Sequence, residues 1–168
     1  MVAKVKVGLD VHGVIDTDPH FFAHLSYMLR AEGHEVHIVT GREICDELLD
    51  KLKKNDVGYT QIFSITSYHK EIGTQIAYKN DDPTQPIIDS VVWDRTKAEY
   101  ADAAGLHFHI DDLPVYGQYF TGSTQFLLYT PQLREFLFRL TGWSDRFARR
   151  LSDIKWPGLD ADEGAVNL

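Results

Sequence analysis

The chain has 168 residues, with 43% hydrophobic and 12% aromatic residues, so it can bury a core and is not of the disordered class. Its formal charge of −8 disfavours binding to a nucleic-acid backbone, but it permits a small phosphorylated substrate, which needs only a local cation or metal ion. The single cysteine, Cys45, cannot form an internal disulfide. No signal peptide and no run of about 18 apolar residues is evident, so we expect a soluble cytoplasmic protein without a membrane span.

Strand and helix patterns alternate along the chain. Short apolar runs predict strands at 5–9, 36–40, 60–65, 106–110 and 125–129. Apolar residues at helical spacing predict helices at 21–29, 48–52, 90–104 and 131–140. This alternation is typical of an α/β fold, a doubly wound, Rossmann-like parallel sheet of about five strands with helices on both faces.

The alternation is interrupted at residues 67–89, where the turn-forming sequence NDDP (80–83) predicts a small hairpin or irregular insertion. We therefore expect a core domain over 1–141 that carries this insertion, and an extension over 142–168. The extension holds a basic cluster, interpreted most simply as a solvated helix face: Arg146, Arg149 and Arg150.

Acidic and hydroxyl side chains stand where the predicted strands end. They are Asp10, Thr40, the residues 64–66, and the pair Asp111 and Asp112. In an open α/β sheet, ligands bind beyond the carboxyl ends of the strands. These side chains are therefore expected to form a cation site.

Four short motifs contain these residues and follow one another in order. They are LDVHGVI at 9–15, HIVTGR at 37–42, WDRTKAE at 93–99 and FHIDD at 108–112. Together they resemble the four motifs of the haloacid dehalogenase superfamily of phosphatases and phosphotransferases. The resemblance spans most of the chain. It implies a magnesium-dependent phosphomonoester hydrolase with a Rossmann-like core.

The resemblance also implies a role for each acidic motif residue. Asp10 matches the nucleophile, which would form an aspartyl-phosphate that water then hydrolyses. Mg²⁺ would be held by Asp10, the backbone carbonyl of His12, and Asp111, with Asp112 as a further or water-mediated ligand. Oxygen ligands of this kind are those that magnesium prefers.

The remaining motif residues would bind the phosphate. Thr40, Gly41 and Arg42 match the segment that donates hydrogen bonds to phosphate oxygens. Lys97 would neutralise the phosphate and hold Asp10 in place. A lysine on a predicted helix is often simply solvated, but this one stands fourteen residues before Asp111, which favours the functional interpretation.

His12 departs from the family pattern, which usually has a second aspartate at this position. Histidine can donate a proton to the leaving alcohol and then accept one from water, because its ordinary pKa is near neutrality. We therefore interpret Asp10, His12 and Lys97 as the catalytic residues. The alternative is a catalytically weak or inactive module that binds phosphate or metal without turnover.

The sequence has no room for a large cap domain, because only a loop and one helix fit between the first two strands. In the superfamily that the motifs resemble, an open site goes with larger substrates such as nucleotides, so the resemblance implies a nucleotidase-like activity on a nucleotide or another phosphorylated metabolite. Four residues of the insertion are candidates to line the site: Tyr68, His69, Tyr78 and Lys79.

Other patterns have simpler interpretations. His20 and His24 have a spacing that can bind zinc, but no second pair lies nearby, so surface histidines are favoured. Asp16 and Asp18 are expected either to gate the site or to be solvated. A phospho-receiver domain also uses aspartates, a threonine and a lysine, but there the paired acids come first and the lysine last, the reverse of the order found here.

Overall fold

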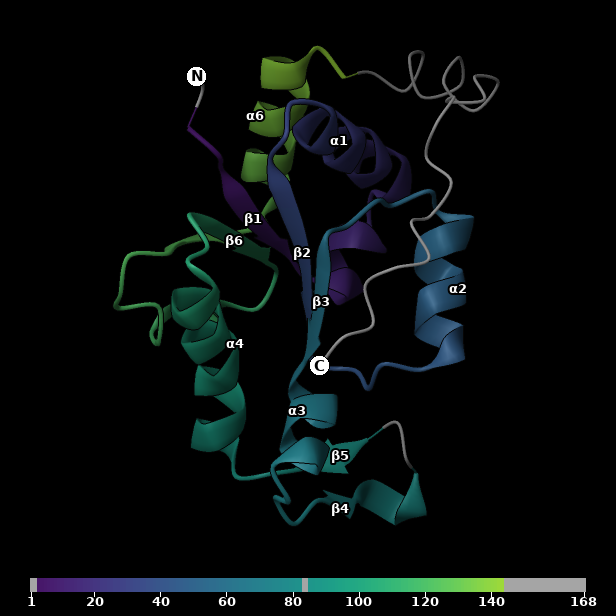
Figure 1. Ribbon diagram of the computed structural model, residues 1–168, viewed down its shortest axis with the longest axis vertical. Coiled ribbons are helices and arrows are strands. Elements are labelled where there is room, and N and C mark those ends of the chain that lie inside the picture. The colour runs from purple at the N-terminus through teal and green to yellow at the C-terminus, as the bar shows by residue number, and fades with distance from the viewer. Residues whose placement is uncertain (1–2, 83–84, 144–168) are drawn as a thin grey trace.

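The computed structural model describes residues 3–82 and 85–143, and a sheet of five parallel strands forms its centre (Figure 1). The strand order is β3-β2-β1-β6-β7, so the chain runs outward from β1 and then crosses back to its other side. The strands are β1 (Lys6–Leu9), β2 (Glu35–Thr40), β3 (Gln61–Ser64), β6 (Phe108–Asp111) and β7 (Gln125–Leu128). The predicted strands and the doubly wound α/β fold are confirmed.

Helices cover both faces of this sheet. Val36 and Ile38 of β2 belong to the larger core cluster, whereas Val39 belongs to a smaller one, as the alternation of side chains along a strand requires. The smaller cluster includes Ala101 of α4 (Ser90–Ala104). Three helices contribute to the larger cluster: α1 (Pro19–Ala31), α2 (Asp46–Lys54) and α6 (Pro131–Thr141). The four predicted helices are therefore present.

Local sequence chemistry fixes the ends of α4, the helix that carries Lys97. The Asp89 side chain accepts a hydrogen bond from the Val92 N–H at 3.0 Å, which satisfies one of the free donors of the first turn. Gly105 ends the helix with φ of 67°, a left-handed conformation that glycine adopts without strain. Both ends coincide with the predicted ones.

The insertion differs in part from its prediction. The predicted strand at 60–65 ends one residue earlier, because the Ser64 hydroxyl accepts the Ser67 N–H at 3.0 Å and starts α3 (Ile65–Glu71). The expected hairpin follows as two short antiparallel strands, separated by the 3₁₀ turn η2: β4 (Ala77–Tyr78), η2 (Lys79–Asp81) and β5 (Pro86–Ile87). In Figure 1, α3 and this hairpin lie below the sheet, beyond the carboxyl ends of its strands.

Of the predicted extension, only Gly142 and Trp143 lie within the described residues. The Trp143 ring is buried, with its centroid 5.8 Å from that of Phe21 on α1. The predicted basic cluster at 146–150 lies outside the described residues. Among the helices of the described ranges, none combines the length and the apolar character needed to cross a membrane.

Candidate active site

Three aspartates meet at the carboxyl end of the sheet. Asp10 directly follows β1, and Asp111 ends β6, its neighbour in the sheet; the Asp10 N–H donates to the Ile110 carbonyl at 3.0 Å. Carboxylate oxygens of Asp10, Asp111 and Asp112 all lie within 4.8 Å of one another. The strand order reverses between β1 and β6, so these residues stand at the switch point where sheets of this type bind ligands.

Lys97 of α4 joins two of these carboxylates. Its Nζ lies 3.0 Å from Oδ1 of Asp10 and 2.6 Å from Oδ2 of Asp111, and its side chain is only 2% exposed. The ring of Tyr116 covers the ammonium group at 4.4 Å from the ring centroid. Lys97 is thus a buried ion-pair partner, not a solvated residue on a helix face.

A buried histidine contacts the same oxygen of Asp111 as Lys97 does. His109 lies 3.2 Å from Oδ2 of Asp111 through Nε2, and its ring stacks on Phe120 at 5.2 Å. Burial lowers the pKa of His109, so the ring is neutral near pH 7 and Nε2 donates to the carboxylate. The other carboxylate oxygen, Oδ1, accepts the Leu113 N–H at 3.0 Å. Asp111 is therefore held in one orientation.

Burial and neighbouring charge give the three carboxyls different affinities for protons. Burial raises the pKa of Asp10 from 3.8 to about 7, although Lys97 opposes this shift. Burial also acts to raise the pKa of Asp111, but the hydrogen bond from His109 and the charge of Lys97 outweigh it and lower that pKa. The pKa of Asp112 is raised by burial and by the charge of Asp111. Because its pKa lies near 7, Asp10 is the carboxyl whose ionisation a bound cation would change most at neutral pH.

The turn after Asp10 is tight, and Gly13 is required in it. Gly13 has φ of 76°, and a Cβ at this position would lie 2.1 Å from Cγ of Asp112. The turn sends the chain away from the site and leaves His12 half-exposed, with Nε2 4.0 Å from Oδ2 of Asp16. Burial lowers the pKa of His12, so its ring is neutral near pH 7.

The segment after β2 lies beside the aspartates. Thr40 is fully buried, and its hydroxyl oxygen accepts the Arg42 N–H at 3.3 Å. The Gly41 carbonyl accepts the Thr66 hydroxyl at 2.7 Å, which ties this turn to the start of α3. The Trp93 ring covers Gly41 so closely that a Cβ there would lie 2.8 Å from it. Gly41 and Arg42 are thus held in a fixed turn and line the site, whereas the predicted residue Thr40 is buried and does not line the cavity.

These groups surround one cavity of about 470 Å³. Its lining includes Asp10, His12, Gly41, Arg42, Thr66, Lys97 and Asp112, as the sequence predicts. The other lining residues were not predicted: Glu43, Cys45, Glu47, Pro86, Trp93, Leu113 and Tyr116. Trp93 stands inside the third motif, four residues before Lys97, so its place on the same helix face as the lysine is the signal that could have identified it.

The insertion contributes to the cavity lining as predicted, but through a residue other than the four that were predicted. Tyr68, His69, Tyr78 and Lys79 do not line the cavity, whereas Pro86 of β5 does. His69 is buried instead, and its ring nitrogens lie 2.9 Å from the Thr74 hydroxyl and 3.0 Å from the Thr96 hydroxyl.

The two loop aspartates form ion pairs and hydrogen bonds and do not line the cavity. Asp16 forms an ion pair with Lys51 at 2.6 Å. Asp18 accepts two hydrogen bonds from the Arg134 guanidinium at 2.6 Å, and one from the Tyr129 hydroxyl at 2.8 Å. Both therefore fasten the loop before α1 to neighbouring helices and the edge strand.

Comparisons with known proteins support the fold alone. No protein-family model matches the chain, and no curated protein sequence matches it. Among solved structures, the chain is similar to the crystal structure of an uncharacterized protein from Corynebacterium glutamicum, with 14% sequence identity and a TM-score of 0.52. The similarity covers 84% of this chain and 95% of that one.

Proposed function

We propose that this chain is a magnesium-dependent phosphomonoester hydrolase of the haloacid dehalogenase type, with Asp10 as the nucleophile. The observation that carries the proposal is the buried pairing of Asp10 with Lys97 and Asp111 at the switch point of the sheet. Lys97 lies between the two carboxylates and holds that of Asp10 at the cavity wall. The four motifs that resemble the superfamily supply these residues in the family's order.

The donor set of the site fits a divalent cation. Lys97 pairs with two of the three carboxylates, and its single positive charge leaves two negative charges uncompensated when all three carboxyls are ionised. The raised pKa of Asp10 reflects this shortage of positive charge as well as burial. Asp10, Asp111 and Asp112 would hold Mg²⁺, with the His12 carbonyl as a further ligand. When bound, the ion would offset the repulsion between Asp10 and a phosphate.

The residues around Asp10 divide the work of phosphoryl transfer. The turn that the buried Thr40 hydroxyl anchors, with its residues Gly41 and Arg42, would orient the phosphate, and Lys97 would neutralise charge on the phosphate oxygens. A carboxylate oxygen of Asp10 then forms a bond to phosphorus while the bond from phosphorus to the ester oxygen breaks. Water hydrolyses the resulting aspartyl-phosphate, and phosphate and the free carboxylate are released.

His12 is the proposed acid and base of both steps. Its imidazolium form would donate a proton to the leaving alcohol, and its neutral form would accept one from the attacking water. Because burial lowers its pKa, the neutral form predominates at pH 7. The histidine therefore suits hydrolysis of the aspartyl-phosphate better than departure of a poor leaving group.

The cavity size favours a phosphorylated metabolite as the substrate. About 470 Å³ accommodates a nucleotide-sized molecule, and Trp93, Tyr116, Leu113 and Pro86 offer an apolar wall to its non-phosphate part. We propose that the substrate is a nucleotide or a similar phosphorylated metabolite, and that the protein acts in the cytoplasm.

Hydrolysis of p-nitrophenyl phosphate with Mg²⁺ tests the activity. Asp10→Asn is expected to lower turnover by roughly 10³-fold or more, because the nucleophile is lost. The matched control is Asp50→Asn, which changes an exposed aspartate on α2 and should retain full activity. Equal turnover by the two variants would contradict the proposal.

The orientation of His12 favours a second candidate, a module that binds metal and phosphate without turnover. The imidazole is near Asp16, and the structure records no hydrogen bond between it and Asp10 within the described ranges. His12→Gln separates the two functions. In an active enzyme, His12→Gln should lower the turnover rate by about 10²-fold to 10⁴-fold. A module without catalytic activity should show no magnesium-dependent turnover, either unaltered or as His12→Gln.

A further inference from the structure

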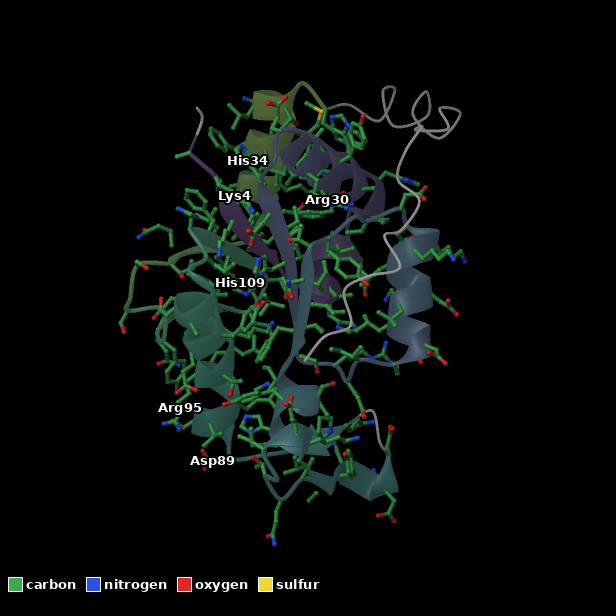
Figure 2. The ribbon with its side chains drawn as sticks, in the orientation of Figure 1. Lys4, Arg30, His34, Asp89, Arg95 and His109 are labelled. Atoms are coloured by element: carbon green, nitrogen blue, oxygen red, sulfur yellow. The ribbon has the colours of Figure 1, made fainter. Side chains whose placement is uncertain are left out.

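A second cavity lies at the opposite end of the sheet, where the parallel strands begin. Its volume is about 340 Å³, and it is lined by Lys4, Tyr27, Arg30, Ala31, Gly33, His34, Glu35 and Thr60. We call it the amino-end cavity. Figure 2 shows three of its basic residues, Lys4, Arg30 and His34, near one another beside the start of β2. None of its residues lines the cavity that contains Asp10.

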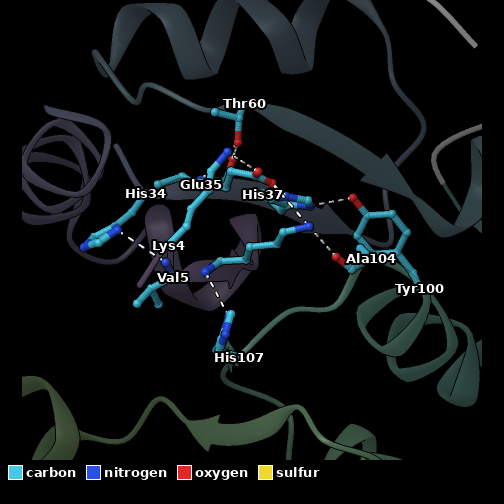
Figure 3. A network of polar contacts seen from close by, with 11 residues as sticks. Lys4, Val5, His34, Glu35, His37, Thr60, Tyr100, Ala104 and His107 are labelled. Carbon is cyan, nitrogen blue, oxygen red and sulfur yellow. Dashed lines mark hydrogen bonds and ion pairs between the residues drawn. The ribbon is translucent and has the colours of Figure 1, made fainter. Parts of the chain in front are cut away.

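Positive charge predominates around the amino-end cavity, although the whole chain carries a formal charge of −8. Its carboxylate, Glu35, is already satisfied: Lys4 lies 2.6 Å from one oxygen, while Lys6 at 3.7 Å and His37 at 3.0 Å approach the other (Figure 3). Lys6 also donates to the Ala104 carbonyl at 2.9 Å. Glu35 therefore keeps partners even when Lys4, whose side chain is 57% exposed, turns toward a ligand.

Arg30 adds a charge that the surrounding residues do not neutralise. Within residues 3–82 and 85–143, its guanidinium forms no ion pair. The side chain packs on Gly58 so closely that a Cβ there would lie 2.4 Å from Nη1. The guanidinium therefore lies against Gly58, Arg30 lines the cavity, and a planar guanidinium suits the paired oxygens of an anion.

His34 contributes a hydrogen-bond donor whose tautomer is fixed. Its Nδ1 accepts the Val5 N–H at 3.3 Å, as Figure 3 shows. The neutral ring must therefore carry its proton on Nε2, where it donates a hydrogen bond. Lys4, Arg30 and His34, which all line one small cavity, thus carry donors of three kinds.

We infer that the amino-end cavity binds a small ligand through a phosphate group, at a site separate from the proposed active site. A tetrahedral dianion offers several acceptor oxygens to the ammonium, guanidinium and imidazole donors at once. About 340 Å³ holds a phosphate with a small substituent, and Tyr27 and Ala31 line the space for the latter. A nucleic-acid backbone is a poor occupant, because the chain's overall charge repels it.

Titration with inorganic phosphate, followed by NMR of the His34 ring, tests this inference. The full chain is used without Mg²⁺, so that phosphate binding at the proposed active site contributes little. Sodium chloride of equal ionic strength serves as the reference for general salt effects. The unaltered protein should show a saturable shift of the His34 resonances. Lys4→Gln and Arg30→Gln should each weaken binding by about tenfold, the effect of one charge-assisted hydrogen bond.

Two further variants control for loss of charge and for folding. Lys53→Gln removes an exposed lysine on α2 and should leave phosphate affinity unchanged. Glu35→Gln removes the negative charge beside the cavity and should strengthen binding, a change that unfolding cannot imitate. Absence of a saturable shift, or equal affinity in Lys4→Gln, Arg30→Gln and Lys53→Gln, overturns the inference.

A parallel titration with phenyl phosphate distinguishes the two sources of the phosphate group. Tighter binding of phenyl phosphate than of inorganic phosphate would assign the cavity to a phosphoester whose substituent contacts Tyr27. Equal affinity would assign it to free phosphate. Either result is compatible with loss or retention of turnover in Asp10→Asn, so this test does not depend on the proposed function.

Discussion

The two ends of the sheet use the same kind of ion pair in opposite environments. At the carboxyl end, Lys97 lies 2.6 Å from Asp111, and the two side chains are 2% and 0% exposed. At the amino end, Lys4 lies 2.6 Å from Glu35, but the side chains are 57% and 19% exposed. Equal distances therefore do not mean equal energies. The first pair is surrounded by further carboxylates and the second by further cations, which suits one end to a metal ion and the other to an anion.

Removal of Lys97 should have the largest effect on folding. Lys97→Met leaves Asp10 and Asp111 buried without their common partner, and breaking a buried pair in this way costs about 3–5 kcal/mol. Urea unfolding of the metal-free protein measures the loss. Lys53→Met, at an exposed position on α2, is the control and should change the free energy of unfolding by less than about 0.5 kcal/mol. A similar decrease in the free energy of unfolding in Lys97→Met and Lys53→Met would show that the buried ion pairs of Lys97 do not stabilise the fold.

Asp10→Asn should have the second largest effect, in the stabilising direction. The folded protein holds the Asp10 proton up to about pH 7, whereas in the unfolded chain the carboxyl ionises near its ordinary pKa of 3.8. The folded state therefore binds more protons between these values, and through this group the free energy of unfolding falls as the pH rises from about 4 to about 7. Asparagine removes this penalty. Without metal at pH 8, Asp10→Asn should be more stable by on the order of 2–4 kcal/mol.

Thermal or urea unfolding at pH 4 and at pH 8 checks this prediction, because the difference between the two proteins should shrink at pH 4. Mg²⁺ should stabilise the unaltered protein more than Asp10→Asn. A variant that is less stable than the parent at pH 8 would contradict the assigned burial cost of Asp10.

Removal of Lys4 should have the smallest effect on folding. Lys4→Met breaks a pair of the same length as that of Lys97, but exposed pairs contribute about 1 kcal/mol or less. Urea unfolding at low and high salt measures it, and the small loss should vanish at high salt. A cost near that of Lys97→Met would remove the contrast between the two ends.

The sequence predicts much of the fold because its signals are local. Apolar runs place the five strands, and Asp89 and Gly105 mark the ends of α4. The helix α3 is missed because Ile65 and Thr66 look like a continuation of the strand. The capping hydrogen bond between Ser64 and Ser67 decides otherwise. Competition of this kind between strand propensity and a cap is not visible in residue patterns alone.

The motif residues of the candidate site are also evident in the sequence, but their environment is not. Nothing in the pattern shows that Lys97 is buried, because burial depends on Tyr116, a residue on a short helix after β6, α5 (Pro114–Gly117). The amino-end cavity is missed for a similar reason. Lys4, Arg30 and His34 belong to no motif and meet only when β1, α1 and β2 pack together.

Trapping of the phosphorylated enzyme is the most direct test of Asp10 as the nucleophile. Borohydride reduces an aspartyl-phosphate to homoserine, so the protein is quenched with borohydride during turnover of p-nitrophenyl phosphate with Mg²⁺, digested and analysed by mass spectrometry. If Asp10 is the nucleophile, homoserine should form at position 10, should depend on substrate and should be absent from Asp10→Asn. Turnover with an unmodified Asp10, or with the modification at another carboxyl, would contradict it.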